Sequence, residues 1–403
     1  MKERLKAPEL RFEGFTDDWE LRKLGSLTTV VRGASPRPIQ DPKWFDKESD
    51  IGWLRIADVT EQNGRIYHLE QHISKLGQEK TRVLTEPHLL LSIAATVGKP
   101  VVNYVKTGVH DGFLIFLNPT FEREFMFQWL EMFRPKWQKY GQPGSQVNLN
   151  SELVRNQEIV LPNYKEQQKI GSFFKQLDDT IVLHQRKLDL LKEQKKGYLQ
   201  KMFPKNGAKV PELRFAGFAD DWEERKFSDF TKLSQGLQIA ISDRFTEAGP
   251  NKEFYITNEF LNPNNTKKYY IENPSKNVIA NKNDILMTRT GNTGKVVTNT
   301  KGVFHNNFFK IDYDPQKISK LFLYFLLTSI PIQKEILIRA GTSTIPDLNH
   351  KDFYNIKVYL PIFEEQQRIG SFFKQLDDTI ALHQRKLDLL KEQKKGFLQK
   401  MFV

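Results

Sequence analysis

The sequence predicts an α+β protein with two globular domains and two long helices that form an antiparallel coiled coil, arranged as a repeat with pseudo-twofold symmetry. Three observations predict this fold: a 38-residue helical segment that occurs twice, a short motif that opens each half of the chain, and two middle regions of mixed β-like and helix-like runs. The expected boundaries are 1–162 for the first domain, 163–205 for the central helix, 206–361 for the second domain and 362–403 for the C-terminal helix.

The repeated segment covers residues 166–203 and 365–402 and differs at three of 38 positions, Lys169/Arg368, Val182/Ala381 and Tyr198/Phe397. It contains no proline and is rich in Lys, Glu, Gln and Leu, which favour helices. A shorter repeat precedes each middle region, at Pro8 to Trp19 and Pro211 to Trp222. Near-identity over such lengths predicts that the two halves of the chain share one structural plan.

Apolar residues in the repeated segment alternate three and four positions apart, which is the spacing of a coiled-coil seam. The seam residues are Ile170, Phe174, Leu177, Ile181, Leu188 and Leu191 in the first copy, and Ile369, Phe373, Leu376, Ile380, Leu387 and Leu390 in the second. Two such helices in one chain most simply pack on each other. At 1.5 Å per residue, each would be roughly 55 Å long.

Polar residues interrupt this seam at His184 and Lys195, and at His383 and Lys394 in the second copy. In one interpretation their polar ends reach solvent at the edge of the seam. In the other they fix the register and orientation of the two helices, as polar seam residues do in some coiled coils. The sequence leaves both open.

Composition limits the function classes. The 61 Lys and Arg residues exceed the 49 Asp and Glu residues, which favours an anionic partner such as nucleic acid or an acidic protein. The absence of cysteine excludes disulfides and cysteine-bound metals. Residues Met1 to Lys6 lack the apolar run of a signal peptide, and the run Leu321 to Leu327 is shorter than the ~20 residues of a membrane helix. We therefore expect a cytoplasmic protein.

The middle regions combine β-like runs (89–93, 101–105, 113–116 and 285–287) with helix-like runs (121–133 and 318–327). Gly, Pro and Asn punctuate them, which indicates long surface loops. Some loops carry side chains that read base edges or bind phosphates. The DNA-binding candidates are Arg32, Ser35, Arg37, Lys99, Gln235, Gln238, Arg289, Asn292 and Lys295. Any one such loop is more often an ordinary surface turn.

The two middle regions resemble each other only faintly. Four short alignments are Gly98-Lys99 with Gly294-Lys295, Val109-His110 with Phe304-His305, Leu149-Asn150 with Leu348-Asn349, and Leu54-Arg55-Ile56 with Phe254-Tyr255-Ile256. We interpret the regions as two domains of one fold with different surfaces. If the domains bind DNA, unlike surfaces predict unlike half-sites and an asymmetric target, whereas like readers predict a palindrome.

Known catalytic motifs are missing. A phosphate-binding loop would need Gly in place of Arg289 and Ser or Thr in place of Val296. Asn118-Pro119 and Asn262-Pro263 lack the second proline of the amino-methyltransferase motif, and no His or carboxylate cluster has metal-ligand spacing. We expect no catalytic residues, no metal site and no cofactor in this chain.

The chain resembles the specificity subunits of type I restriction–modification systems. The resemblance covers the whole chain. Its most specific part is the junction into each long helix, Leu161-Pro162 with Glu166 to Ile170, and Leu360-Pro361 with Glu365 to Ile369. It implies two target recognition domains, an antiparallel helical spacer and no catalytic residues. It also implies a bipartite double-stranded DNA target methylated at adenine N6, two methyltransferase subunits and two restriction subunits. S-adenosylmethionine, ATP and Mg²⁺ would belong to those partners.

A rival hypothesis is a coiled-coil adaptor that joins two protein partners, since such a protein also needs long helices and no catalytic residues. A stand-alone nuclease or methyltransferase is disfavoured by the missing motifs. A steep dependence of DNA affinity on salt would separate the DNA-binding hypothesis from the adaptor.

Overall fold

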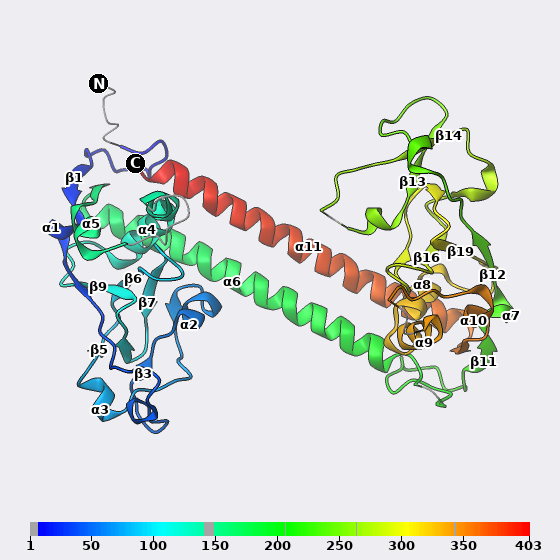
Figure 1. The fold of residues 1–403 in the computed structure, drawn as a ribbon, viewed down its shortest axis with the longest axis horizontal. Coiled ribbons are helices and arrows are strands. Elements are labelled where there is room, and N and C mark those ends of the chain that lie inside the picture. Colours follow the sequence, from blue (N-terminus) through cyan, green and yellow to red (C-terminus); the bar gives the residue numbers. More distant parts are fainter. Residues whose placement is uncertain (1–6, 141–148, 206, 263, 342–343) are drawn as a thin grey trace. The chain divides into compact units, whose positions relative to one another are not determined.

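A computed structural model describes residues 7–140, 149–205, 207–262, 264–341 and 344–403 (Figure 1). Residues 1–6, on which the expected lack of a signal peptide depends, and Pro263 lie outside this range. The chain forms two compact units. Unit 1 comprises Met1–Gln185 with Arg385–Val403, and unit 2 comprises Arg186–Gln384. Each unit therefore contains one globular domain and parts of both long helices.

The domain of unit 1 contains three sheets. The five-stranded sheet has the order β2-β9-β6-β7-β4, with β2 Thr29–Arg32, β4 Arg65–Ile66, β6 Leu89–Ser92, β7 Pro100–Asn103 and β9 Phe113–Leu117. The three-stranded sheet has the order β3-β8-β5, with β3 Gly52–Trp53, β5 Arg82–Leu84 and β8 Thr107–Val109. Strands β1 Glu20–Lys23 and β10 Glu158–Leu161 pair antiparallel. The helices are α1 Leu24–Leu27, α2 Ile56–Glu61, α3 Lys75–Gln78, α4 Arg123–Trp137 and α5 Ser151–Asn156.

The domain of unit 2 also contains three sheets. One has the order β12-β19-β16-β17, with β12 Thr231–Gln235, β16 Ile285–Thr288, β17 Val296–Val297 and β19 Phe308–Tyr313. A second has the order β14-β13-β18-β15, with β13 Lys252–Ile256, β14 Tyr270–Glu272, β15 Ile279–Ala280 and β18 Gly302–Phe304. Strands β11 Glu223–Lys226 and β20 Lys357–Leu360 pair antiparallel. The helices are α7 Phe227–Phe230, α8 Lys320–Thr328, α9 Ile330–Ala340 and α10 His350–Tyr354.

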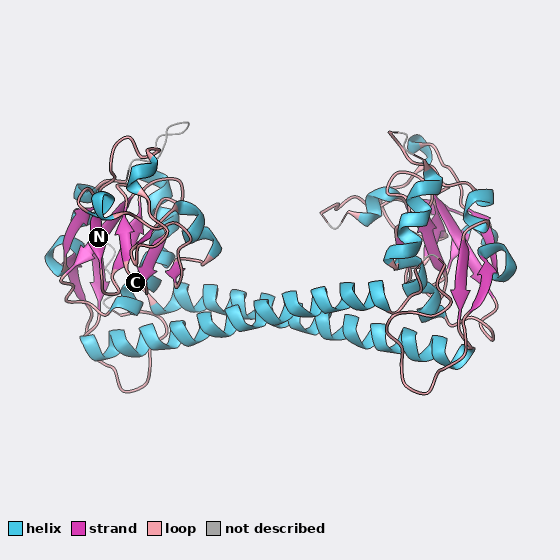
Figure 2. Ribbon diagram, turned by 90° about the horizontal axis from the view of Figure 1, so that it is seen from below, coloured by secondary structure: helices cyan, strands magenta, loops and turns pink. Residues whose placement is uncertain are grey.

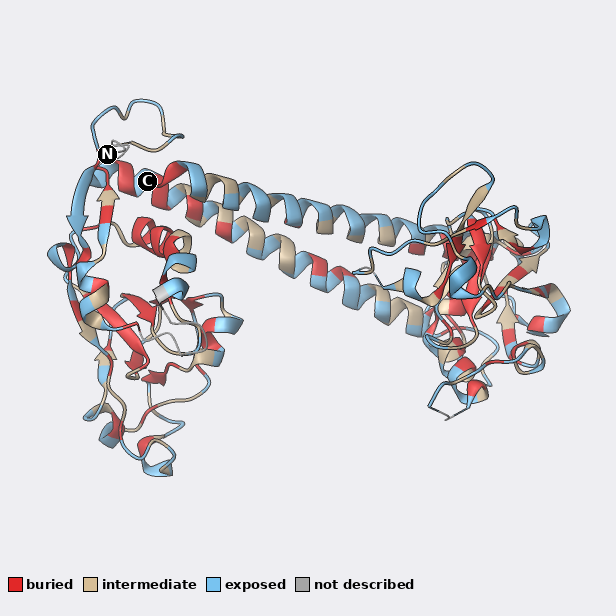
Figure 3. Ribbon diagram, turned by 45° about the horizontal axis from the view of Figure 1, so that its top comes forward, coloured by how far each residue is buried: buried red, intermediate tan, exposed pale blue. Residues whose placement is uncertain are grey.

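Burial explains these elements. Strands β6, β9 and β16 read as continuous apolar runs because almost all of their residues are buried on both faces of the sheet. Figure 2 shows strands and short helices together in each domain, and Figure 3 shows the buried residues concentrated in those strands. The predicted α+β class is therefore confirmed.

The two repeated segments form the long helices α6 Tyr164–Lys201 and α11 Phe363–Met401. In unit 1, the rings of Phe173 and Phe397 lie 5.2 Å apart, so the start of α6 packs beside the end of α11. In unit 2, Tyr198 and Phe372 are also 5.2 Å apart, so the end of α6 packs beside the start of α11. The predicted antiparallel pairing is confirmed within each unit, and all twelve predicted seam residues are buried or half-buried.

The helix ends complete the domain cores. In unit 1, the ring of Phe402 at the end of α11 lies 5.3 Å from Phe125 and 5.8 Å from Phe174. In unit 2, Phe203 after α6 lies 5.8 Å from Phe322 and 6.1 Å from Phe373. Burying one such ring contributes about 1.5–3 kcal/mol. Both repeats make the same contacts, which accounts for the identity of their buried positions.

The polar seam lysines form ion pairs between the two helices. Lys195 Nζ lies 2.6 Å from Asp377 Oδ1 in unit 2, and Lys394 Nζ lies 2.5 Å from Asp178 Oδ1 in unit 1. For the lysines, the interpretation that their ends reach solvent is therefore wrong, because each ammonium group binds a carboxylate of the facing helix. Both pairs favour the interpretation in which polar seam residues set the register of the two helices.

Within the described part of the chain, no single helix has the length and apolarity to cross a membrane. Helices α8 and α9 reach that threshold only as a pair bent by 61°, and most of the apolar residues of α8 are buried in the domain core.

Candidate nucleic-acid interface

Three of the predicted DNA-binding residues converge on one residue of unit 1, Asp111. Arg32 Nε donates to the backbone oxygen of Asp111 at 2.6 Å. Ser35 Oγ donates to Asp111 Oδ1 at 2.8 Å, and Arg37 donates to Asp111 Oδ2 at 2.7 Å. Asp111 lies in the turn between β8 and β9 and was not predicted. It organises the loop that follows β2.

The Asp111 carboxyl is ionised near neutral pH. Partial burial alone would raise the pKa of Asp111, but the Ser35 hydrogen bond and the charges of Arg37 and Arg32 outweigh it and hold the pKa below its ordinary value. Asp111 therefore stays ionised. The Arg37 side chain is 77% exposed although it is paired with this carboxylate. The turn thus presents an exposed guanidinium group in a fixed position.

Gly33, His110 and Trp53 hold this loop against the turn, and we call them the frame of the first domain. A Cβ atom on Gly33 would lie 2.1 Å from the backbone oxygen of His110, so only glycine permits this close approach. His110 Nδ1 accepts a hydrogen bond from the backbone N–H of Gly112 at 2.9 Å, and the His110 ring lies 5.9 Å from Trp53. Burial lowers the pKa of His110, so the imidazole is neutral at pH 7.

A cavity of about 290 Å³ lies beside this frame. Its lining includes Arg37, Trp53, Arg55, His110 and Asp111. Arg55 is held by Asp58 at 2.7 Å and by Glu70 at 3.1 Å. The cavity therefore combines an aromatic wall with fixed polar groups, which is the chemistry of a binding surface.

The second domain repeats the frame with Gly236, His305 and Tyr255. A Cβ atom on Gly236 would lie 2.1 Å from the backbone oxygen of Phe304 and 2.4 Å from that of His305. His305 Nδ1 accepts from the backbone N–H of Asn307 at 3.0 Å, and its ring lies 5.7 Å from Tyr255. Burial lowers the pKa of His305 as well.

The polar groups on this second frame are different. Asn306 Nδ2 donates to Gln238 Oε1 at 2.9 Å. Gln238 follows Gly236 by two positions, as Ser35 follows Gly33, and Asn306 follows His305 as Asp111 follows His110. The same two positions are thus joined by a hydrogen bond in both domains, once with a carboxylate and once between amides.

Strand registers fix the equivalence of the frames. In the parallel pair β3–β8, Trp53 lies opposite Gly108, and in β13–β18, Tyr255 lies opposite Val303. Trp53 therefore corresponds to Tyr255, and the alignment of Arg55 with Tyr255 is wrong by two residues. The alignment of Val109-His110 with Phe304-His305 is confirmed. Asn150 and Asn349 also correspond, since each caps the short helix that follows it.

Comparison with known proteins identifies this arrangement. The family described as the type I restriction modification DNA specificity domain matches residues 16–193 and 219–392. The chain belongs to this family. Both of its domains are therefore DNA specificity domains, and the chain is a DNA sequence-recognition subunit of the type I restriction–modification class. Specificity domains supply recognition rather than catalysis, and the adaptor alternative is not favoured.

Several relatives agree with this assignment. The putative type I restriction enzyme MjaX specificity subunit of Methanocaldococcus jannaschii is 22% identical over 95% of this chain and 92% of its own length. The MjaVIII specificity subunit of the same organism is 21% identical over 95% and 91%. The S subunit from M. genitalium has the same fold, with a TM-score of 0.64, 15% identity and coverage of 98% of this chain and 99% of its own. A chain from a structural study of complex assembly in the type I R-M system also has this fold, with a TM-score of 0.57 and 16% identity. The match covers 95% of this chain and 97% of that chain.

Gln235 is the exposed last residue of β12, opposite Phe309 of β19, and stays a prediction as a DNA contact. The other four candidates lie in one turn that both specificity domains share. Gly98 N–H donates to Ser92 at 2.8 Å, and Gly294 N–H donates to Thr288 at 2.9 Å, so the alignment of Gly98-Lys99 with Gly294-Lys295 is confirmed. Lys99 is almost fully buried and bound to Glu131 and Asn63, which argues against a DNA contact.

The second copy of this turn is more accessible. Asn292 and Lys295 are exposed. Arg289 is half-buried, binds Asp347 at 2.7 Å and lies 5.7 Å from the ring of Phe309. Arg289 thus holds the turn in place, whereas Asn292 and Lys295 are accessible to a ligand. All three stay predictions as DNA contacts.

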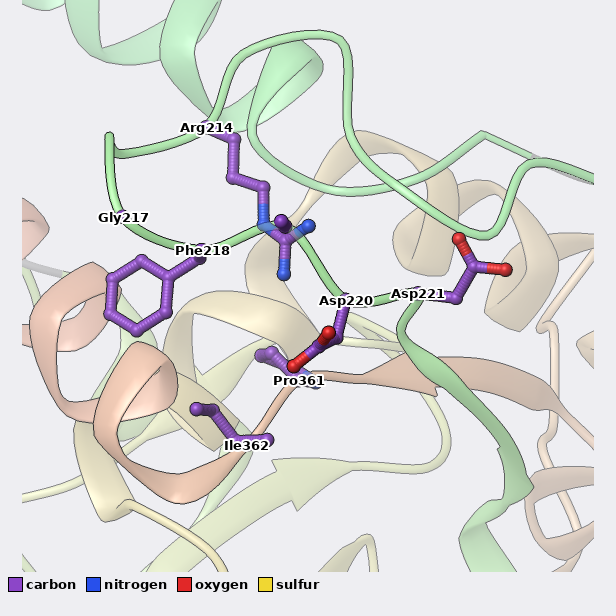
Figure 4. Close-up of a pocket in the computed structure, with 8 residues that line it drawn as sticks. Arg214, Gly217, Phe218, Asp220, Asp221, Pro361 and Ile362 are labelled. Carbon is purple, nitrogen blue, oxygen red and sulfur yellow. The ribbon is translucent and has the colours of Figure 1, made fainter.

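The short motif that opens each half is structural. Arg214 donates two hydrogen bonds of 2.7 Å to the fully buried Glu365, and Arg11 makes the same pair with Glu166 at 2.6 and 2.7 Å. Figure 4 shows Arg214 beside a cavity of about 60 Å³, which the Gly217–Asp221 loop and Pro361 also line. This space suits a few water molecules rather than a nucleotide.

The described residues contain no group of three His, Cys, Asp or Glu side chains able to hold a metal ion. The family motif Glu-Gln-Gln at the start of each long helix also has a structural role. Gln167 Oε1 accepts from the backbone N–H of Glu122 at 2.9 Å, and Gln366 Oε1 accepts from that of Ser319 at 3.0 Å. These bonds tie α4 and α8 to the long helices.

Proposed function

We propose that the chain recognises an asymmetric, bipartite DNA target, with one half-site for each specificity domain. One observation carries this proposal: the two domains share one frame but present different polar groups on it, Ser35, Arg37 and Asp111 in the first and Gln238 with Asn306 in the second. Equal frames with unequal polar groups suit two half-sites of different sequence. The two long helices act as the spacer that leaves a gap between the half-sites.

We further propose that two methyltransferase subunits and two restriction subunits act with this chain in the cytoplasm. Each unit exposes large apolar side chains on both long helices, Leu183 (66%) and Leu389 (57%) in unit 1, and Leu382 (64%) and Leu190 (51%) in unit 2. These residues correspond between the two repeats, so the units offer two like surfaces for two copies of one partner. S-adenosylmethionine, ATP and Mg²⁺ would be bound by the partners.

The experiment that tests the bipartite target is a domain exchange. Residues 206–361 are replaced by the corresponding domain of another type I specificity subunit, and the hybrid is assembled with its methyltransferase partner. Sequencing of methylated adenines is expected to show one new half-site and one unchanged half-site. A change in both half-sites, or methylation of a palindrome by the natural chain, would contradict the proposal.

A second measurement addresses the spacer. One heptad is inserted into each long helix so that antiparallel pairing is preserved: after Arg186 in α6 and after Arg385 in α11, near the points where the units divide the helices. Seven residues add about 10 Å of helix, so the unread gap is expected to lengthen while both half-sites stay the same. An unchanged gap with unchanged affinity would exclude the spacer role.

A further inference from the structure

We propose that the polar groups on each frame read one base pair: Arg37 and Asp111 recognise a G·C pair, and Gln238, which Asn306 orients, recognises an A·T pair. This inference rests on the proposed DNA-reading function and adds the residues and bases. In the first domain the pair joins the loop after β2 to the turn that contains His110, and in the second it joins the loop after β12 to the turn that contains His305.

The frames hold together, before DNA binds, the two segments that carry each pair. Gly33 and Gly236 bring their loops to within contact distance of the backbone at His110 and His305. Each histidine is further fixed by a hydrogen bond to its Nδ1 and by contact with an aromatic ring. Polar groups that are held in place lose little conformational entropy when they bind a base, so they discriminate well between bases.

In the first domain the chemistry suits guanine and cytosine. Arg37 carries five N–H donors, its side chain is 77% exposed, and Asp111 fixes its orientation. Arginine binds guanine O6 and N7 with two hydrogen bonds, and an ionised aspartate accepts from the cytosine amino group. Arg37 and Asp111 thus offer donors and an acceptor side by side, as a G·C pair requires.

In the second domain the chemistry suits adenine. The Gln238 side chain is exposed, and Asn306 binds its oxygen. A carboxamide presents one donor group and one acceptor, which complements adenine N6 and N7. Neither residue carries a charge, and the guanidinium of Arg244 at this frame is bound to the backbone oxygen of Ile239 and lies over the ring of Tyr255 at 5.2 Å.

Contact with phosphate explains these pairs less well. A carboxylate beside Arg37 would repel a phosphate, and the uncharged amides of Gln238 and Asn306 gain little from the charge of the DNA backbone. The negative charge of Asp111 and the neutrality of the second pair are expected for groups that face base edges.

The test replaces each proposed reader in the full-length chain. Arg37→Gln and Gln238→Arg variants, assembled with the methyltransferase partner, are presented with a randomised pool of DNA duplexes, and bound fragments are sequenced. Arg37→Gln is expected to reduce the preference for one G·C pair about tenfold or more in one half-site only. Gln238→Arg is expected to shift one A·T position toward G·C in the other half-site. Arg22→Gln, which alters another exposed arginine of the first domain, serves as the control and should leave the selected sequence unchanged.

Different outcomes test the proposed function and the assignment of the readers separately. If the natural chain selects no split sequence, the proposed function itself fails. If it selects one and both variants select the same bases, the assignment of the readers is wrong. A uniform loss of affinity without a change of preferred bases would assign Arg37 to phosphate and would also overturn the inference. Asp111→Asn provides an independent arm, which should weaken the same G·C position as Arg37→Gln.

Discussion

Lys195 of α6 and Asp377 of α11 form an ion pair of 2.6 Å, and the repeat reproduces it between Lys394 and Asp178. In each pair the lysine comes from the last third of one long helix and the aspartate from the first half of the other. A slip of the helices by one heptad would move all four charges away from their partners. The two pairs therefore select one antiparallel register from several that the apolar seam alone would allow.

Replacing Lys394 by Met is expected to lower the free energy of unfolding by about 1–2 kcal/mol, because the mostly buried Asp178 then loses a direct charge partner. Arg65 and Gln128 still bind Asp178 and limit the loss. Urea unfolding measures the effect. Lys192→Met, at an exposed position of α6, is the control and should stay within about 0.5 kcal/mol of the natural chain. Equal stability of both variants would mean that the ion pair does not stabilise the folded chain.

Acid stability should depend on Asp178. Burial alone would raise the pKa of this carboxyl, but Lys394, Gln128 and Arg65 outweigh burial and hold the pKa below its ordinary value. A depressed pKa stabilises the folded state above the unfolded-state pKa of about 3.9, and this contribution is lost as the pH falls through the folded-state value. The Asp178→Asn variant should therefore lose less stability than the natural chain as the pH falls below about 4.

Unfolding followed by fluorescence between neutral and acidic pH checks this dependence. The matched control is Asp179→Asn, since Asp179 lies next in the chain but its side chain is 58% exposed. The control should keep the acid profile of the natural chain. If Asp178→Asn also keeps that profile, other groups cause the acid sensitivity.

The buried pair of Arg11 and Glu166 gives a larger expected effect. Glu166 is fully buried, so Arg11→Ala leaves its carboxylate without its bidentate partner and should cost about 3 kcal/mol of unfolding free energy. Arg22→Ala removes an exposed arginine paired with Glu20 and should cost at most about 0.5 kcal/mol. Thermal melting of the two variants makes the comparison. Similar melting temperatures would show that the opening motif does not stabilise unit 1.

The sequence predicted the long helices and their pairing because the signal is repeated and periodic over 38 residues. It also predicted Arg32, Ser35 and Arg37 as a group, but it missed Asp111, on which they converge. A single aspartate in a turn carries no pattern of its own. Extending the alignment of His110 with His305 by one residue would have matched Asp111 with Asn306.

Other parts depend on tertiary contacts that no local pattern reveals. Trp53 and Tyr255 occupy equivalent positions on short, dissimilar strands, so an alignment by similarity placed them two residues apart. Lys99 and Lys295 occupy the same turn, but Lys99 is buried against Glu131 of α4 whereas Lys295 is exposed. Burial of a single lysine is decided by the neighbouring helix rather than by its own segment.

Two glycines of one helix should respond oppositely to alanine. A Cβ atom on Gly171 would lie 2.4 Å from Glu122 Oε2 and 2.8 Å from the backbone nitrogen of Phe125, where α4 begins against α6. Gly197 has no atom within 4 Å of the added Cβ. Gly197→Ala should therefore raise the unfolding free energy by about 0.5–1 kcal/mol through helix propensity. Gly171→Ala should lower it by about 1–3 kcal/mol through overpacking.

The second repeat offers an internal replicate of this comparison, since Gly370 is crowded by the backbone nitrogen of Phe322 at 2.8 Å and Gly396 is open. Urea unfolding of all four variants should divide them by environment, with Gly171 and Gly370 in one class and Gly197 and Gly396 in the other. If the variants of one repeat instead differ in stability from those of the other, the close approach of α4 and α8 to the long helices does not determine the effect of alanine. A division by environment would show that Gly171 and Gly370 are required because a domain helix begins directly against each of them.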